Sequence, residues 1–349
     1  MSYKIIDVPS GRVQIHPGIS NGDLKEIAAN RKVSIVQFAE PLSEKELNNL
    51  ETYVFKHRSD IELRVYGHYS AECDLSFLIK FPELKKFSAD CLLRAKNVDY
   101  ITSLENLEEL KVAIYDLNSF DLLSKININL KRLLLGSTAS KKPSIEALSR
   151  FKNLEHLYLE GQINGLQEIC HLKNLQKIVL RSITTKDLNF LQDLEYLWSI
   201  DIKLGGIKNF SALIKLPNLK YLELWQINKL SDISFISELK SLQNLFIQSL
   251  RNIEALPSFD KNQSLRRIYL ENLKGLKDLT SLKTAPALEE FIYVMAQNQQ
   301  IEYLMPVIEN ESTKKIFVRF GSVSKNNVFD NLVIKNGKQL YEYHDFQYE

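Results

Sequence analysis

One spacing of apolar residues recurs along most of this 349-residue chain. Clear copies are LEELKVAIY, LEHLYLEGQ, LQKIVLRSI, LKYLELWQI, LQNLFIQSL and LRRIYLENL, with apolar residues at positions 1, 4 and 6 and mostly at position 9. Position 1 is Leu84, Leu107, Leu130, Leu154, Leu175, Leu197, Leu219, Leu242, Leu265 and Leu288, and a degenerate copy starts at Thr313. The steps are 21 to 25 residues long. This period predicts a repeat architecture in which each unit buries its apolar face against its neighbours.

Each unit is expected to contain a strand and a compact return segment. Positions 4 and 6 alternate with polar residues, which is typical of a short, half-buried strand. Between strands, apolar residues are spaced by three, as at Leu75, Leu78, Phe81 and Leu84. That spacing over so few residues favours a 3-10 turn or a single helical turn.

The pattern resembles the leucine-rich-repeat family, and specifically the short repeats of about 22 residues in bacterial internalins. The resemblance covers residues 60–320, in about 11 units. It implies an α/β fold: a curved solenoid with a parallel sheet on the concave face and short helical or 3-10 segments on the convex side. Position 9 departs from the family, which usually has asparagine there. Here it holds Leu92, Tyr115, Gln162, Ile183, Ile227, Leu250 and Leu273, so apolar packing is expected to replace an asparagine ladder.

Residues 1–59 are predicted to form an N-terminal α/β cap, because a repeat stack must cover its exposed ends. Strands are expected at 11–16 and 33–38, and a short helix at 21–32. Ser43 followed by Glu46 forms a capping-box signature for a second helix over 43–58. An independent N-terminal domain is the alternative.

Residues 321–349 are predicted to form the C-terminal cap. Asn336-Gly337 lies between two alternating runs, which favours a β-hairpin over 332–343. The final stretch YEYHDFQYE is aromatic and acidic. It is expected to be part of this cap, and a short interaction tail is the alternative.

The charge balance argues against nucleic-acid or membrane partners. There are 45 basic and 43 acidic residues, for a net charge of +2, far from the basic excess of a typical polyanion binder. No apolar run approaches the roughly 18 residues of a membrane span, and the N-terminus lacks a secretory-signal pattern. We therefore expect a cytoplasmic bacterial protein and a monomer. A secreted, internalin-like adhesin is a weaker alternative.

The sequence offers little catalytic chemistry. Its six histidines show no metal-ligand spacing, and Cys73, Cys91 and Cys170 form no CxxC pair. No nucleotide-binding or hydrolase motif is present. We predict a protein that is not an enzyme and that uses neither a metal nor a cofactor. The competing hypothesis is an active site in one of the caps, in which His16, His57 or His68 would meet carboxylates.

Positions 3, 5 and 7 should project from the concave face, where large aromatic residues gather. Trp225 is the most unusual of them, because a surface position carries the largest side chain. Aromatic anchors and mixed charges are typical of protein interfaces. The predicted partner-binding residues are Tyr158, Glu160, Arg181, Lys203, Tyr221, Glu223, Trp225, Phe246, Tyr269 and Glu271.

The predicted function is a protein–protein interaction module that binds a partner on the concave face. An immunity or antitoxin protein that occludes a toxin is one form of it. An alternative explanation is that β-rich surfaces favour aromatic residues and that a cap covers Ile292 and Phe317. The assignments depend on strand register, because a slip of one residue exchanges the two faces. Near Leu197 the sequence LEYLWSIDIKL allows two alignments.

Overall fold

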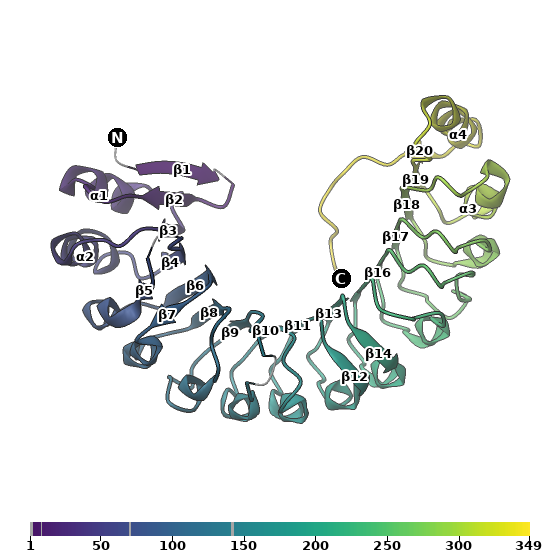
Figure 1. Ribbon diagram of the computed structural model, residues 1–349. Helices are drawn as coiled ribbons and strands as arrows, with labels where there is room; N and C mark the ends of the chain where they lie inside the picture. The colour runs from purple at the N-terminus through teal and green to yellow at the C-terminus, as the bar shows by residue number, and fades with distance from the viewer. Residues whose placement is uncertain (1–2, 8, 70, 141–142) are drawn as a thin grey trace. The chain divides into compact units, whose positions relative to one another are not determined.

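The computed structural model describes residues 3–7, 9–69, 71–140 and 143–349. They form two compact units, residues 1–175 and 176–349, and each is built around a largely parallel sheet (Figure 1). Among the described residues, no helix is both long and apolar enough to cross a membrane.

The first unit contains eight strands in one sheet, in the order β1-β2-β3-β4-β6-β8-β9-β10. Only β1 is antiparallel to its neighbour among the described pairs of this sheet. The strands are β1 (Tyr3–Asp7), β2 (Arg12–Ile15), β3 (Ile35–Phe38), β4 (Glu62–Gly67), β6 (Lys86–Leu92), β8 (Glu109–Ile114), β9 (Arg132–Leu135) and β10 (His156–Glu160), with the small pair β5 (Cys73–Asp74) and β7 (Ala95–Lys96) beside them. Its helices are α1 (Asn21–Ala29) and α2 (Glu44–Leu50), which runs into a π-helical turn at Glu51–Phe55.

The second unit contains the strands of one parallel sheet, in the order β11-β13-β15-β16-β17-β18-β19-β20. They are β11 (Lys177–Arg181), β13 (Ser199–Lys203), β15 (Tyr221–Trp225), β16 (Asn244–Gln248), β17 (Arg267–Glu271), β18 (Glu290–Val294), β19 (Lys315–Val318) and β20 (Gln339–Leu340), with the pair β12 (Thr184–Asp187) and β14 (Gly206–Asn209) at the side. Two helices, α3 (Met305–Glu309) and α4 (Val323–Lys335), lie near its end.

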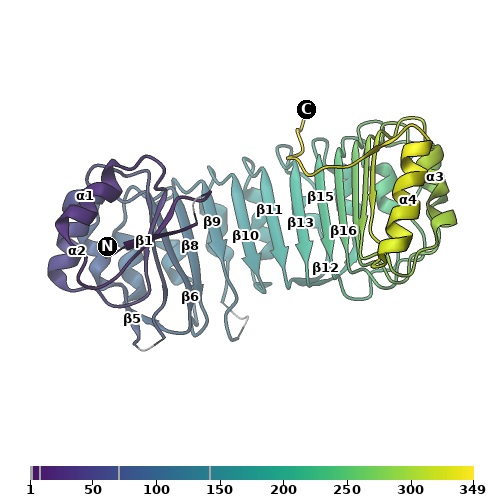
Figure 2. The same ribbon diagram turned by 90° about the horizontal axis from the view of Figure 1, so that it is seen from above.

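Short 3-10 segments connect the strands, as the spacing of three predicts. They are Leu75–Lys80, Val98–Ser103, Asp121–Ser124, Glu146–Arg150 and Leu166–His171 in the first unit, and Asn189–Leu191, Ser211–Lys215, Ser234–Glu238, Thr280–Thr284 and Ile301–Leu304 in the second. Within each unit they lie on one side of the sheet (Figures 1 and 2). We call the opposite side the open face. It corresponds to the face predicted to bind a partner.

The core lies between the sheet and the return segments, and the predicted register places the correct residues in it. In β15, Leu222 and Leu224 are fully buried and pair with Leu245 and Ile247 of β16. The uncertain repeat at Leu197 follows the same register, because Ile200 and Ile202 of β13 are also fully buried. Equivalent positions therefore stack in rows across each sheet, and positions 5 and 7 form rows on the open face.

The corner after each strand is tighter than the apolar pattern alone indicates. Position 8 has a left-handed backbone in eight repeats, at Cys91, Gly161, Ser182, Leu204, Gln226, Ser249, Asn272 and Met295. For a residue other than glycine this conformation costs about 1 kcal/mol or more. The position 9 side chains Leu92, Ile183, Ile227, Leu250 and Leu273 are all buried immediately afterwards. Their packing offsets the strain, which agrees with apolar packing in place of an asparagine ladder.

Two position 9 residues differ from that apolar pattern. Gln162 is fully buried, where its Nε2 donates to Gly136 O at 2.7 Å and its Oε1 accepts from Glu160 N at 2.8 Å. It therefore bonds neighbouring backbones as a ladder residue does. Tyr115 is 49% exposed, so it does not contribute to the packed row.

The N-terminal segment forms the predicted local structures. Both helices begin with capping boxes, Ser20 with Asp23 and Ser43 with Glu46. Strand β2 pairs with β3, and β3 pairs with β4, so this segment extends the sheet of the first unit. The proposed division at residues 59 and 320 stays a prediction.

The predicted hairpin over 332–343 is wrong. Residues 323–335 form α4, and β20 pairs in parallel with β19. Gly337 has φ +74° and follows the helix C-cap Asn336, and its N–H donates to Ile334 O at 2.9 Å. A left-handed glycine is equally suited to a helix C-terminus and to a hairpin turn. The buried residues Phe329 and Val333, four apart, favour the helix because they pack on one side of it.

Candidate functional site

The open face of the second unit brings together eight of the ten predicted partner-binding residues: Arg181, Lys203, Tyr221, Glu223, Trp225, Phe246, Tyr269 and Glu271. They lie on β11, β13, β15, β16 and β17. Tyr158 and Glu160 lie instead on β10 of the first unit, where the Tyr158 hydroxyl donates to Glu160 at 3.3 Å. The candidate site is therefore the face of the second unit.

Trp225 lies on this face within reach of two cations on the two preceding strands of the sheet. Strand register aligns Arg181, Lys203 and Trp225 in one row. The Arg181 guanidinium carbon is 5.7 Å from the centroid of the indole ring, and Lys203 Nζ is 5.9 Å from it. Both distances are within the range of a cation–π interaction. The half-buried indole is thus held in a defined orientation at the surface.

Two carboxylates hold Lys203 in place. Its Nζ lies 3.1 Å from Asp201 Oδ2 and 3.0 Å from Glu223 Oε1. We call Arg181, Asp201, Lys203, Glu223 and Trp225 the Trp225 cluster. Burial alone would lower the pKa of Lys203, but the two carboxylates outweigh it and raise the pKa, so the ammonium stays charged. Burial and the neighbouring Glu223 raise the pKa of Asp201 to about 6, although Lys203 opposes them.

The raised pKa of Asp201 predicts a specific pH dependence of stability. Between its ordinary value of 3.8 and about 6, the folded chain binds this proton more tightly than the unfolded chain does. This carboxyl therefore makes the free energy of unfolding fall as pH rises from 4 to 6, by roughly 1–3 kcal/mol. Asp201→Asn should remove this part of the pH dependence of the free energy of unfolding. Urea unfolding at pH 4.5 to 7.5 would measure it, with the exposed-carboxylate variant Glu195→Gln as control. Identical pH profiles for wild type and Asp201→Asn would contradict the assignment.

A second aromatic contact lies beside the cluster. Phe246 and Tyr269 have ring centroids 4.9 Å apart at 68°, in an edge-to-face arrangement. Ile292 and Phe317 occupy the equivalent positions on the next two strands, but Ile292 is only 2% exposed. Arg319 stacks on Phe317 at 3.8 Å and is bonded to Asp330 of α4. The row is therefore interrupted at Ile292, and Phe317 beyond it is half-buried in contact with Arg319.

Residues 341–349, which we call the C-terminal tail, return across the open face of the second unit (Figures 1 and 2). The ring of Tyr348 lies 5.1 Å from Trp198 and 6.5 Å from Tyr221. Tyr221 also donates to Glu223 at 2.9 Å, and burial raises its pKa above the ordinary range. Tyr221, predicted as an exposed anchor, is therefore already covered by the tail.

The residues that hold the tail are not among the predicted partner-binding residues, except for Tyr221. The others lie at positions 2 and 3, where each strand begins: Trp198, Lys220, Gln243, Asn244, Arg266 and Arg267. Trp198 carried a detectable signal, because it is a tryptophan at a position that other repeats fill with polar residues.

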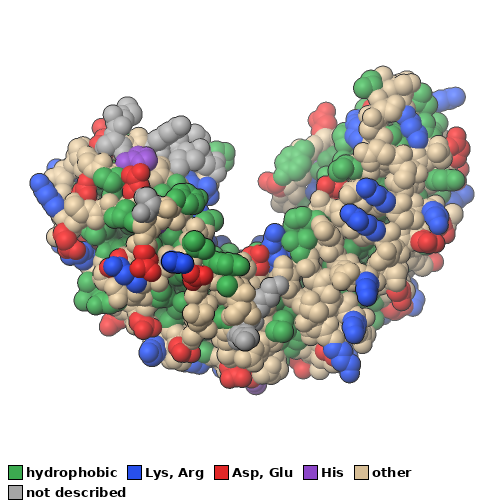
Figure 3. Space-filling model, in the orientation of Figure 1, with side chains coloured by type: hydrophobic (Ala, Val, Ile, Leu, Met, Phe, Trp, Pro, Cys, Tyr) green, Lys and Arg blue, Asp and Glu red, His purple; other side chains and the backbone are tan. Residues whose placement is uncertain are grey.

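Mixed charge surrounds these aromatic groups. Acidic and basic side chains are interspersed over the visible surface of the second unit (Figure 3). The predicted contact residue Glu271 accepts a hydrogen bond from Gln248 of the neighbouring strand β16 at 2.8 Å, which fixes the position of its carboxylate. The face lacks the one-sign stripe that would favour a polyanion.

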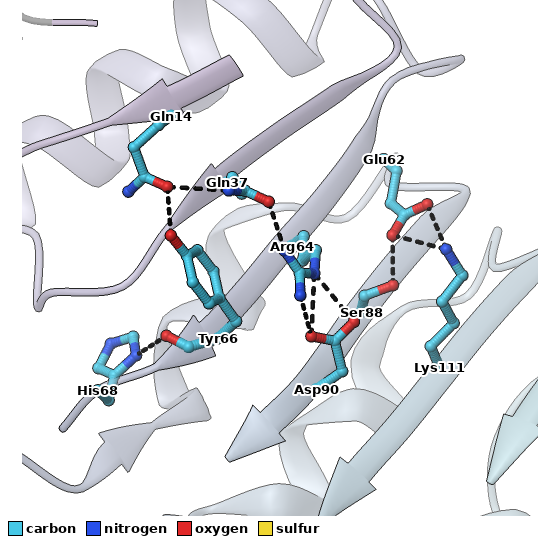
Figure 4. A network of polar contacts seen from close by, with 9 residues as sticks. All are labelled: Gln14, Gln37, Glu62, Arg64, Tyr66, His68, Ser88, Asp90 and Lys111. Atoms are coloured by element: carbon cyan, nitrogen blue, oxygen red, sulfur yellow. Dashed lines mark hydrogen bonds and ion pairs between the residues drawn. The ribbon is translucent and has the colours of Figure 1, made fainter. Parts of the chain in front are cut away.

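The open face of the first unit holds a connected polar network (Figure 4). Gln14 accepts from Gln37 at 2.9 Å and from Tyr66 at 2.7 Å, and Arg64 is paired with Asp90. Nearby, Lys111 is 2.9 Å from Glu62. Because these buried or half-buried groups satisfy one another, we assign the network to stabilising the strands.

The histidines of the alternative enzyme hypothesis are dispersed. His16 and His57 are exposed, whereas His68 lines a surface pocket of about 560 Å³ with Glu72 and Cys91. Burial lowers the pKa of His68 and raises that of the Cys91 thiol, which does not favour a thiolate nucleophile. Within the described ranges, no group of three or more His, Cys, Asp or Glu residues is arranged to hold a metal ion.

Comparisons with known proteins give structural matches alone. No family model and no curated protein matches the chain. An internalin (InlF) from Listeria monocytogenes has a TM-score of 0.52 at 16% identity, over 80% of this chain and 86% of the internalin. A leucine-rich-repeat protein of Leptospira interrogans has a TM-score of 0.53 at 15% identity, over 87% and 81%.

The TLR13–ssRNA13 complex has a TM-score of 0.52 at 15% identity, and the match covers 87% of this chain but 53% of the receptor chain. At these identities the similarity concerns the fold. The repeat period, the stacked parallel strands and these matches together confirm the predicted resemblance: the chain has a leucine-rich-repeat fold of the short, internalin-like kind.

Proposed function

We propose that this chain binds a partner protein through the open face of its second unit. The Trp225 cluster and the Phe246–Tyr269 pair would form the contact. The observation that carries the proposal is the indole of Trp225, held at the surface by contacts with Arg181 and Lys203 while Leu222 and Leu224 fill the core side of the same strand. Tryptophan and arginine are among the residues that contribute most to protein interfaces.

The charges of the cluster support a protein partner over a nucleic acid. Asp201 and Glu223 lie beside the cations, and carboxylates at the centre of a site repel a phosphate backbone. The TLR13 complex contains RNA, so nucleic-acid binding is the alternative that the experiment must separate. An inhibitor that occludes a toxin is one form of the proposed module. Monomeric state and bacterial cytoplasm stay predictions.

The nature of the partner can be tested by capture. The full chain is immobilised and exposed to an extract of its source cell, with and without prior nuclease treatment. We expect a protein to be retained equally in both. Retention that disappears after nuclease treatment would contradict the proposal, because the bound species would then be a nucleic acid or would depend on one.

A further inference from the structure

The C-terminal tail has the side-chain pattern of an extended peptide bound on one face. His344 and Phe346 are half-buried against the sheet, and Tyr348 contacts it through its ring. The intervening Asp345 and Gln347 are exposed, and Tyr343 is 87% exposed. Alternation with a period of two means that every second side chain faces the strands. The tail therefore docks through defined residues.

Two aromatic side chains of the tail, Phe346 and Tyr348, occupy separate binding positions on the sheet, which we call seats. Phe346 lies under two guanidinium groups, 4.9 Å from Arg266 and 5.0 Å from Arg267. Tyr348 packs against Trp198 and Tyr221, and its hydroxyl accepts from Asn244 at 3.2 Å. The seats receive side chains two residues apart. This spacing corresponds to the pattern aromatic–any residue–aromatic.

The main chain of the tail is held by side chains of the sheet. Gln243 Nε2 donates to Glu349 O at 3.1 Å, and its Oε1 accepts from Glu349 N at 3.0 Å. Arg266 donates to Gln347 O at 2.6 Å. These bonds are made to main-chain atoms of Gln347 and Glu349, so they do not depend on the side chains at those two positions.

The charges of the two surfaces are complementary. Arg266 Nη1 is 3.1 Å from a Glu349 carboxylate oxygen, and Lys220 donates to Glu349 O. Arg267 contacts His344 and is also paired with Glu290 at 2.7 Å, which fixes the position of its guanidinium. An acidic peptide therefore fits this surface better than a basic one does.

We infer that Trp198, Tyr221, Gln243, Arg266 and Arg267 form a peptide track for an extended, acidic segment with two aromatic side chains two residues apart, and that the C-terminal tail occupies this track in cis. The inference rests on the proposed function, since the partner protein would supply the competing segment. A tethered tail acts at an effective concentration on the order of millimolar. The partner must displace it, so the tail limits access to part of the open face.

The test uses a fluorescent synthetic peptide, YEYHDFQYE, titrated into the full chain and followed by anisotropy. The full-length variant Phe346→Ala/Tyr348→Ala leaves both seats empty. We expect this variant to bind the peptide at least about 10-fold more tightly than the wild type, because the competitor in cis is lost. A peptide with the same two replacements should bind neither chain. Adding Trp198→Ala should reverse the gain, with far-UV circular dichroism and thermal unfolding confirming that each variant is folded.

Equal peptide affinity for the wild type and the double variant, or no binding to either, would overturn the inference. The proposed function is judged separately, by capture of a protein with the wild type and with Trp225→Ala, because Trp225 is not among the residues that contact the tail. If the peptide fails to bind while Trp225→Ala abolishes capture of a protein, the track is wrong and the proposed function stands. If the peptide binds as expected and no protein is captured, the proposed function fails.

Discussion

Replacing Leu224 by alanine should lower the free energy of unfolding by about 2–5 kcal/mol, whereas replacing the next residue, Trp225, should lower it by only about 1 kcal/mol. Leu224 is fully buried at position 6, so truncation leaves a cavity between the sheet and the return segments. Trp225 points to the open face, so its truncation removes two cation–π contacts at a half-buried site. Although tryptophan is the larger residue, its loss should therefore cost less.

Urea unfolding followed by far-UV circular dichroism measures this difference without depending on tryptophan fluorescence. Ile247→Val, a smaller truncation in the neighbouring core, provides a graded control with an expected loss of about 1 kcal/mol. Equal losses for Leu224→Ala and Trp225→Ala would mean that the two residues do not lie on opposite faces.

Trp225→Ala should weaken binding of the partner protein by at least about 30-fold, which corresponds to about 2 kcal/mol. The indole is ordered by Arg181 and Lys203 before any partner arrives, so little conformational entropy is lost when it is covered. Truncation also releases the two cations from the ring. Trp225→Phe should fall between the wild type and Trp225→Ala, because a smaller ring keeps part of both contacts.

Titration of the captured partner against the three chains measures this series. A loss in Trp225→Phe equal to that in Trp225→Ala would mean that the site needs the indole N–H or its full size. A change of less than about twofold in Trp225→Ala would contradict the anchor role.

The repeat and its register could be predicted because they depend on residues that lie close together in the sequence. Apolar residues at positions 4 and 6 recur in the repeat strands and place Ile200 and Ile202 in the core even where two alignments were open. The capping boxes at Ser20 and Ser43 likewise depend on residues three apart. Local chemistry decides both features, so the sequence is sufficient for them.

The C-terminal region was mispredicted because its local signal fits two structures. Asn336-Gly337 favours a left-handed turn, which a hairpin and a helix C-terminus both use. The choice depends on Phe329 and Val333 finding a surface to pack against. The same limit applies to Ile292, whose burial follows from the fold around it and not from its own repeat.

The candidate site was predicted in part for a related reason. Trp225 and its row follow from strand register, but the covering of Tyr221 by Tyr348 is a contact between segments far apart in the sequence. No local pattern encodes where an extended tail docks. Tyr158 and Glu160 lie in the first compact unit, so their grouping with the site stays a prediction.

The central claim is tested most directly by capture of a partner from the source-cell extract with three immobilised full-length chains: wild type, Trp225→Ala and Tyr196→Ala. Tyr196 is a matched aromatic control, 61% exposed in the turn before β13 and outside the strands of the open face. We expect one protein to be retained by the wild type and by Tyr196→Ala and to be lost by folded Trp225→Ala. The same protein retained equally by all three chains would contradict a partner site at Trp225.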